Sequence, residues 1–92
     1  MENDKRFEII SRALEHYGAT RQIMKVCEEY SEATVAVLHH LDGKISREEV
    51  ISEIADVEIM NKQMQILYGV DEVRKEIDRK LERLEKRMRE GR

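Results

Sequence analysis

Three glycines divide this proline-free chain into four stretches, each about as long as a helix. Gly18, Gly43 and Gly69 each follow a run whose apolar residues recur at helical spacing. Glycine is favoured directly after a helix because it adopts a left-handed backbone conformation without a steric penalty. Strand and turn signals are few elsewhere. We therefore predict an all-α fold, with helices over about residues 5–17, 20–41, 46–68 and 72–90.

Two polar residues mark the expected starts of the later helices. Ser46 is followed three residues later by Glu49, the Ser-x-x-Glu pattern of a capping box. Asp71 lies just after Gly69 and has the side chain to cap the fourth helix. Both predictions concern hydrogen bonds to the free N–H groups of a first helical turn.

Apolar stripes indicate which helix faces should be buried. The first helix carries such a stripe at 3-4-3 spacing, and the second carries a longer one that includes Cys27, the single cysteine, which we expect to be buried. Apolar residues nearly encircle the third helix, and the fourth has a narrow stripe close to coiled-coil spacing. The stripe of the first helix consists of Phe7, Ile10, Leu14 and Tyr17. That of the second consists of Ile23, Val26, Cys27, Tyr30, Thr34, Val37 and Leu41. That of the fourth consists of Val73, Ile77, Leu81, Leu84 and Met88.

Size and composition predict one domain over residues 1–92. A chain of 92 residues has a marginal core, so we expect a homodimer or homotetramer to complete it. Hydrophobic residues make up 40% of the chain, too many for a disordered segment. The net charge of −3 argues against a nucleic-acid partner. No apolar run has transmembrane length and the first residues lack a signal-peptide core, so we expect no membrane partner and a cytoplasmic location.

Two pairs of acids are the most informative polar pattern. Glu29 with Glu32, and Glu53 with Asp56, are each three residues apart on consecutive predicted helices. Residues at this spacing are neighbours on one helix face, so antiparallel packing would bring four carboxylates together. Such a cluster requires a counterion, and hard divalent cations such as Mg²⁺ or Mn²⁺ prefer carboxylate oxygens. The sequence therefore predicts a divalent metal site between these helices.

The pattern Glu28-Glu29-x-x-Glu32 followed by Glu53-x-x-Asp56 resembles the EExxE…ExxD motif of the MazG-like, all-α nucleoside triphosphate pyrophosphohydrolases. The resemblance implies a four-helix bundle that acts as a Mg²⁺-dependent enzyme, cleaving an NTP or dNTP to the monophosphate and pyrophosphate. It implies that Glu29, Glu32, Glu53 and Asp56 hold the metal. Glu32 would also orient the attacking water, and Glu28 would support the site.

Basic residues are expected to hold the phosphates of the nucleoside triphosphate substrate. The resemblance places such residues after the second acid pair, and Lys80, Arg83 and Arg87 fit that place. Lys25, one helical turn before Glu29, is a further candidate. Arginine and lysine are suited to this role because they offer charged donors to phosphate oxygens.

Other interpretations of the same residues remain open. The acids could form a solvated helix face with ion pairs such as Lys25 with Glu29, and the basic strip of the fourth helix could be solvated among its glutamates. The chain could be a non-catalytic helical dimerisation module that uses its fourth helix. A carboxylate-bridged di-iron protein is disfavoured, because that chemistry needs Glu-x-x-His, and here both second positions are acids.

Overall fold

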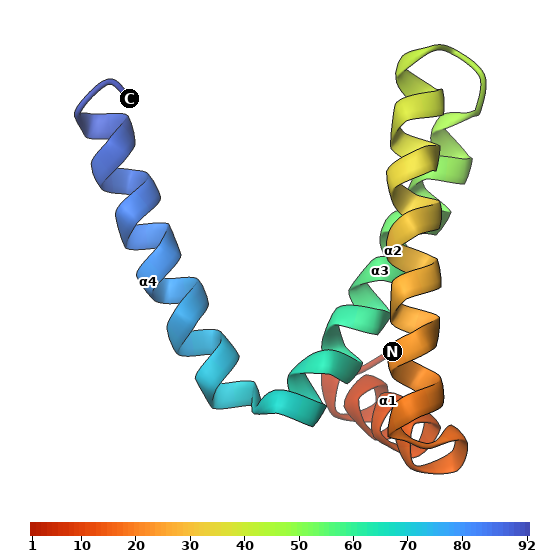
Figure 1. Cartoon of the computed structure of the whole chain (residues 1–92). Coiled ribbons are helices and arrows are strands. Elements are labelled where there is room, and N and C mark those ends of the chain that lie inside the picture. Colours follow the sequence, from red (N-terminus) through yellow and green to blue (C-terminus); the bar gives the residue numbers. More distant parts are fainter.

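The computed structural model describes all residues from Met1 to Arg92 and contains four α-helices and no strand (Figure 1). This arrangement confirms the predicted all-α fold. Each of the three glycines that were expected to end a helix lies one or two residues after the last residue of a helix. The helices are α1 (Asn3–Tyr17), α2 (Ala19–Leu41), α3 (Arg47–Tyr68) and α4 (Val70–Arg89).

α2 and α3 form an antiparallel hairpin that is the main packing unit of the chain. α1 lies across the open end of this hairpin and contacts both of its helices (Figure 1). α4 contacts only α3 and leaves the hairpin as a separate arm, so that the chain has the outline of a V. The four helices therefore do not close into the predicted four-helix bundle within one chain.

The start of α3 follows the predicted capping box. The Ser46 Oγ accepts a hydrogen bond from the Glu49 backbone N–H at 3.2 Å. The prediction for Asp71 was wrong, because α4 begins two residues earlier than predicted, at Val70, and Gly69 occupies the N-cap position. Asp71 instead lies in the first turn of α4 with Glu72, where negative charge favours the positive end of the helix dipole.

Gly69 makes the bend that separates α4 from α3. Its φ is +116°, a conformation that side chains with a Cβ rarely adopt. A Cβ at this position would also come within 3.2 Å of the Glu72 carboxylate. Without this glycine, nothing in the flanking residues would prevent α3 from continuing into α4, since neither side contains proline.

One chain is much more extended than a compact protein of its size. Its radius of gyration is 16.0 Å, whereas about 12.3 Å is expected for 92 residues. Its accessible surface of 7487 Å² exceeds by roughly 1,900 Å² the value of about 5,600 Å² typical of its mass. Only five residues are buried, and two of them, Val26 and Met60, are apolar.

Most of the predicted apolar stripe of α2 is exposed. Cys27 is exposed, contrary to the prediction, and Tyr30, Val37 and Leu41 are exposed as well. The reason is geometric: α3 covers only one edge of this stripe, at Val26, together with the neighbouring polar face that carries Gln22 and Glu29. Helical periodicity identified the apolar face correctly, but most of that face is not covered by the rest of the chain.

The other helices also expose apolar residues that were predicted to be buried. Phe7 and Tyr17, at the two ends of the α1 stripe, are each 52% exposed. On α3, Ile51 and Ile54 face solvent. Every residue from Arg74 onward is exposed, which includes most of the α4 stripe. None of the four helices has the length and apolar character that crossing a membrane requires.

Removing the cap of α3 should weaken the hairpin. We expect Ser46→Ala to lower the free energy of unfolding by about 1 kcal/mol, because the Glu49 N–H loses its acceptor. Ser46→Asp should retain most of the stability. Urea denaturation followed by circular dichroism measures both, and Ser52→Ala, at an exposed position inside α3, is the control. Equal stability of Ser46→Ala and Ser52→Ala would contradict the role of the cap.

Candidate metal centre

The buried face between α2 and α3 is unusually polar. On α2 the buried residues are Gln22, Val26 and Glu29, and on α3 they are Met60 and Gln63. Buried amides and carboxylates are stable only when they find hydrogen-bond partners or counterions. The main packing contact of the chain therefore includes groups that need a polar partner.

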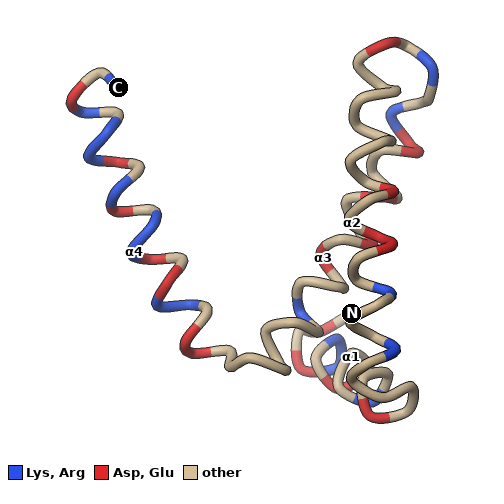
Figure 2. Tube along the Cα trace, viewed as in Figure 1, with Lys and Arg blue, Asp and Glu red and all other residues tan.

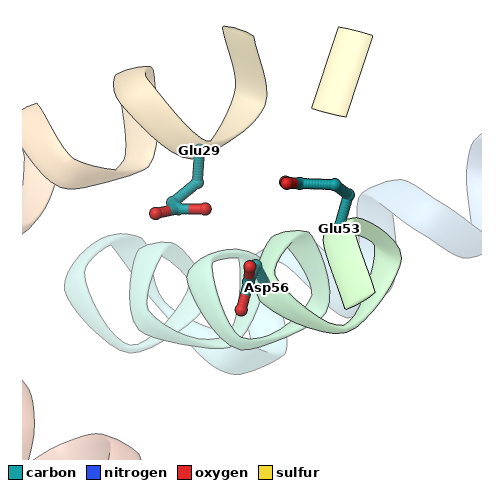
Figure 3. A group of neighbouring side chains, drawn as sticks. All are labelled: Glu29, Glu53 and Asp56. Carbon is teal, nitrogen blue, oxygen red and sulfur yellow. The ribbon is translucent and has the colours of Figure 1, made fainter. Parts of the chain in front are cut away.

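Three carboxylates meet in this interface. Glu29 projects from α2, and Glu53 and Asp56 project from α3, into the space between the two helices (Figure 3). One ligand atom from each residue lies within 4.8 Å of the others. The sequence prediction that the two acid pairs converge is thus met for three of its four residues.

Two oxygens of this group are buried and have no hydrogen-bond partner. They are the Oε2 atoms of Glu29 and Glu53. The whole of Glu29 is only 8% exposed, so the solvated-face interpretation does not describe it. A buried carboxylate oxygen without a donor is costly, and a cation between the two helices would satisfy both atoms.

Lys25 is the one cation that pairs with this region. Its Nζ lies 3.2 Å from the Glu29 Oε1 and 3.9 Å from the Glu28 Oε2. The adjacent Glu29 carboxylate raises the pKa of Lys25 above its ordinary value. No ion pair involves Glu53 or Asp56, so the negative charge of these two carboxylates is left uncompensated.

Glu53 has the carboxyl group most affected by this environment. Burial raises its pKa above the ordinary value, and the negative charges of Glu32, Asp56 and Glu29 raise it further. Both effects disfavour the charged form: burial removes water from the carboxylate, and the neighbouring acids repel it. Perturbed carboxyl groups of this kind are common at functional sites.

Glu32 and Glu28 lie outside the group of three. Glu32 is exposed and is not among the residues whose ligand atoms converge, although its charge contributes to the raised pKa of Glu53. Glu28 is exposed beside Lys25. The structure thus places Glu32 at the edge of the carboxylate group, whereas the sequence prediction gave it an equal share of the metal.

The basic strip of α4 is not near the carboxylates within one chain. Lys80, Arg83 and Arg87 lie on the arm, which makes no contact with α2 (Figure 2). The figure shows positive and negative residues alternating along this arm. Of the four residues predicted to bind phosphate, only Lys25 lies beside the acids.

Three polar residues of the interface between α2 and α3 were not singled out from the sequence. Gln22 and Gln63 are buried at positions seven residues from Glu29 and Asp56, so they share their helix faces. This heptad spacing was a signal that could have identified them. In addition, the Tyr30 hydroxyl donates a hydrogen bond to the Asn61 Oδ1 and so links α2 to α3 beside the carboxylates. No sequence pattern selects Asn61.

The donor set fits a hard divalent cation. All three residues offer carboxylate oxygens, and no histidine or cysteine takes part, which favours Mg²⁺ or Mn²⁺ over iron or zinc. Two oxygens bound to one Mg²⁺ lie at most about 4.2 Å apart, because each bond is about 2.1 Å long. The separations between the three oxygens, all within 4.8 Å, would have to shorten by at most about 0.6 Å when such an ion binds.

Comparisons of the chain with protein-family models, with curated proteins and with solved structures gave no match. The carboxylate group and the motif that supplies it are therefore the features of this chain that bear on its function.

The raised pKa of Glu53 predicts a pH-dependent effect of Glu53→Gln in metal-free protein. In the unfolded chain a glutamate has a pKa of about 4.3, and folding raises that of Glu53, so the charged side chain destabilises the fold at neutral pH. The variant should melt at a higher temperature than the wild type at pH 7, and this advantage should shrink as the pH falls and vanish below the unfolded pKa, as Glu53 becomes protonated in both states. Thermal melts in a chelator measure it. A difference that does not change with pH would contradict the prediction.

A bound divalent cation should stabilise the hairpin. We expect millimolar Mn²⁺ or Mg²⁺ to raise the melting temperature of the wild type, because the cation binds the folded state alone. Glu29→Gln and Asp56→Asn should abolish this increase. Glu58→Gln is the matched control, since Glu58 is on α3 two residues from Asp56 but is exposed outside the carboxylate group. Loss of the increase in the control, or its retention in both site variants, would exclude this site.

Proposed function

We propose that the chain is a metal-dependent nucleotide pyrophosphohydrolase that cleaves an NTP or dNTP to the monophosphate and pyrophosphate. The observation that supports this most is the meeting of Glu29, Glu53 and Asp56, with two buried oxygens that have no partner. The motif that contributes these residues resembles that of the MazG-like pyrophosphohydrolases. Geometry and motif thus favour the same site.

A triphosphate resists hydrolysis because its negative charge repels a nucleophile. Bound Mg²⁺ would neutralise part of that charge and stabilise the charge that develops on the leaving pyrophosphate. The chain's own contribution is to hold the carboxylates on two rigid helices, so that little rearrangement is needed when metal and nucleotide bind. The reaction consumes one water and breaks the bond between the α- and β-phosphates.

Two side chains at the edge of the carboxylate group fit further roles. Glu32 is exposed to solvent and its charge acts on Glu53, so its carboxylate would orient a water and accept its proton. Lys25 pairs with Glu29, which favours its charged form, and it would contact a phosphate oxygen. Glu28 shares the Lys25 ammonium group and would help to hold it in position.

The predicted phosphate role of the α4 residues is harder to reconcile with this chain. Lys80, Arg83 and Arg87 would need a second subunit to bring α4 to the carboxylates, because the arm of the same chain does not reach them. Lys25 is therefore the phosphate-binding residue on which the proposal depends.

The second candidate is a helical dimerisation module without catalytic activity. The exposed apolar stripe of α4 favours this function, because an isolated amphipathic helix of this kind requires a partner. The two functions are compatible in one protein, and nucleotide hydrolysis separates a catalytic from a purely structural role.

The decisive experiment is a panel of NTPs and dNTPs incubated with Mg²⁺, with monophosphate and pyrophosphate both quantified. We expect equal amounts of the two products from at least one nucleotide. Glu53→Ala and Asp56→Ala should each reduce the rate at least a hundredfold, because each removes a metal ligand. Lys25→Ala should mainly raise KM.

Glu58→Ala is the control for this assay, and circular dichroism should show that all variants keep their helices. Full activity in Glu53→Ala would remove the site assignment. Absence of turnover with every nucleotide, in protein that is folded and binds Mn²⁺, would leave a metal-binding module instead of this enzyme.

A further inference from the structure

α4 presents an apolar surface that no other part of the chain covers. The side chains of Ile77, Leu81, Leu84 and Met88 are between 44% and 63% exposed. The chain also exposes roughly 1,900 Å² more surface than a compact protein of its mass. A standard protein interface buries about 800 Å² on each partner, and α4, which has no buried residue, contributes to this excess.

The four apolar residues follow the heptad pattern of a coiled coil. Their 4-3-4 spacing places Ile77 and Leu84 at d positions and Leu81 and Met88 at a positions of the repeat abcdefg. The e and g positions flank such a seam and determine how two helices pair. Each position carries one sign of charge: the e residues are Asp78 and Glu85, and the g residues are Lys80 and Arg87.

This segregation of charge distinguishes parallel from antiparallel pairing. In a parallel pair, a g residue faces the e residue five positions later on the other helix, so Lys80 would face Glu85 of the second copy, twice by symmetry. In an antiparallel pair, g faces g and e faces e. Lys80 would then face a lysine or arginine, and Asp78 would face an acid. Opposite charges therefore meet only in the parallel arrangement.

We propose that α4 pairs with α4 of a second copy of this chain in a parallel, two-stranded coiled coil. The seam consists of the four apolar residues, and Lys80 and Glu85 form the interchain ion pairs. Arg83, at an outward c position, takes no part in the seam. This pairing does not depend on the carboxylate site or on hydrolysis, so its test is independent of the test of the proposed function.

Charge reversal tests the orientation of the helices. Sedimentation equilibrium at low ionic strength should show a wild-type dimer of twice the 10.9 kDa chain mass. Lys80→Glu should weaken the dimer roughly fivefold to thirtyfold, because two attractive pairs become repulsive. The double variant Lys80→Glu/Glu85→Lys should restore the wild-type dissociation constant to within about twofold, since the pairs are re-formed with reversed signs.

Lys86→Glu is the matched control for this series. Lys86 is at an outward f position, and like Lys80 it follows a glutamate four residues earlier, so both variants lose the same kind of intrahelical pair. We expect it to change the dissociation constant less than about twofold.

Each other outcome contradicts the proposal in a specific way. A tighter dimer in Lys80→Glu would indicate antiparallel pairing, because the new glutamate would relieve repulsion. A weaker dimer that Glu85→Lys does not restore would indicate that α4 docks on another part of the second copy. A wild-type monomer at every concentration tested, or an assembly of four chains, would exclude the two-stranded coiled coil.

Disulfide trapping provides an independent measurement of the same geometry. In a Cys27→Ser background, Leu84→Cys should form an interchain disulfide in a glutathione buffer, because equivalent d residues face each other in a parallel pair. Glu82→Cys, at an outward b position, should remain reduced. Equal crosslinking of the two variants, or none at residue 84 in a protein that circular dichroism shows to be helical, would overturn the proposal.

Discussion

The negative charge of the acids packed between α2 and α3, and the need to compensate it, is the constraint on which this structure depends. This interface is the largest packing contact of the chain, and Glu29 is one of only five buried residues. Lys25 compensates one carboxylate, whereas burial and the neighbouring acids raise the pKa of Glu53 and disfavour its charged form. Apolar residues of similar size would pack there at a lower electrostatic cost. Because the acids are retained in the main interface, stability and cation binding are expected to be coupled.

α2 and α3, which carry the acids, also fix the relative positions of the site residues. The acids project from the middle of regular helices, where the backbone is fully hydrogen-bonded, and the Tyr30–Asn61 hydrogen bond links the helices beside them. Sites built on rigid elements need little reorganisation on binding. A loop-borne cluster of carboxylates could separate to relieve repulsion, whereas here α2 and α3 would have to move apart.

Helix positions were predictable because their determinants are local. Gly18 and Gly69 end helices through their own backbone conformation, and Ser46 starts one through a hydrogen bond three residues away. The i, i+3 spacing likewise brought Glu53 and Asp56 together. It did not bring Glu32 into the same group, because three residues also rotate a side chain by roughly 60° around the helix. That rotation takes Glu32 to the exposed edge of the face that α3 covers.

Tertiary placement was less predictable, for two physical reasons. Periodicity shows that Cys27, Tyr30 and Val37 share an apolar face, but it does not show which element packs against that face. The position of α4 depends on the torsion angles of Gly69, and a hydrophobic pattern carries no information about torsion angles at a glycine. The first difference concerns which surface covers an apolar face, and the second concerns the backbone conformation of one residue.

That bend has a mechanical consequence. α4 is about 30 Å long, so a change of 20° at Gly69 would displace its far end by roughly 10 Å. The carboxylates belong to the hairpin and would keep their mutual distances during such a swing. One residue thus separates the dimensions of any assembly built through the arm from the geometry of the carboxylate group, and each could change in evolution without disturbing the other.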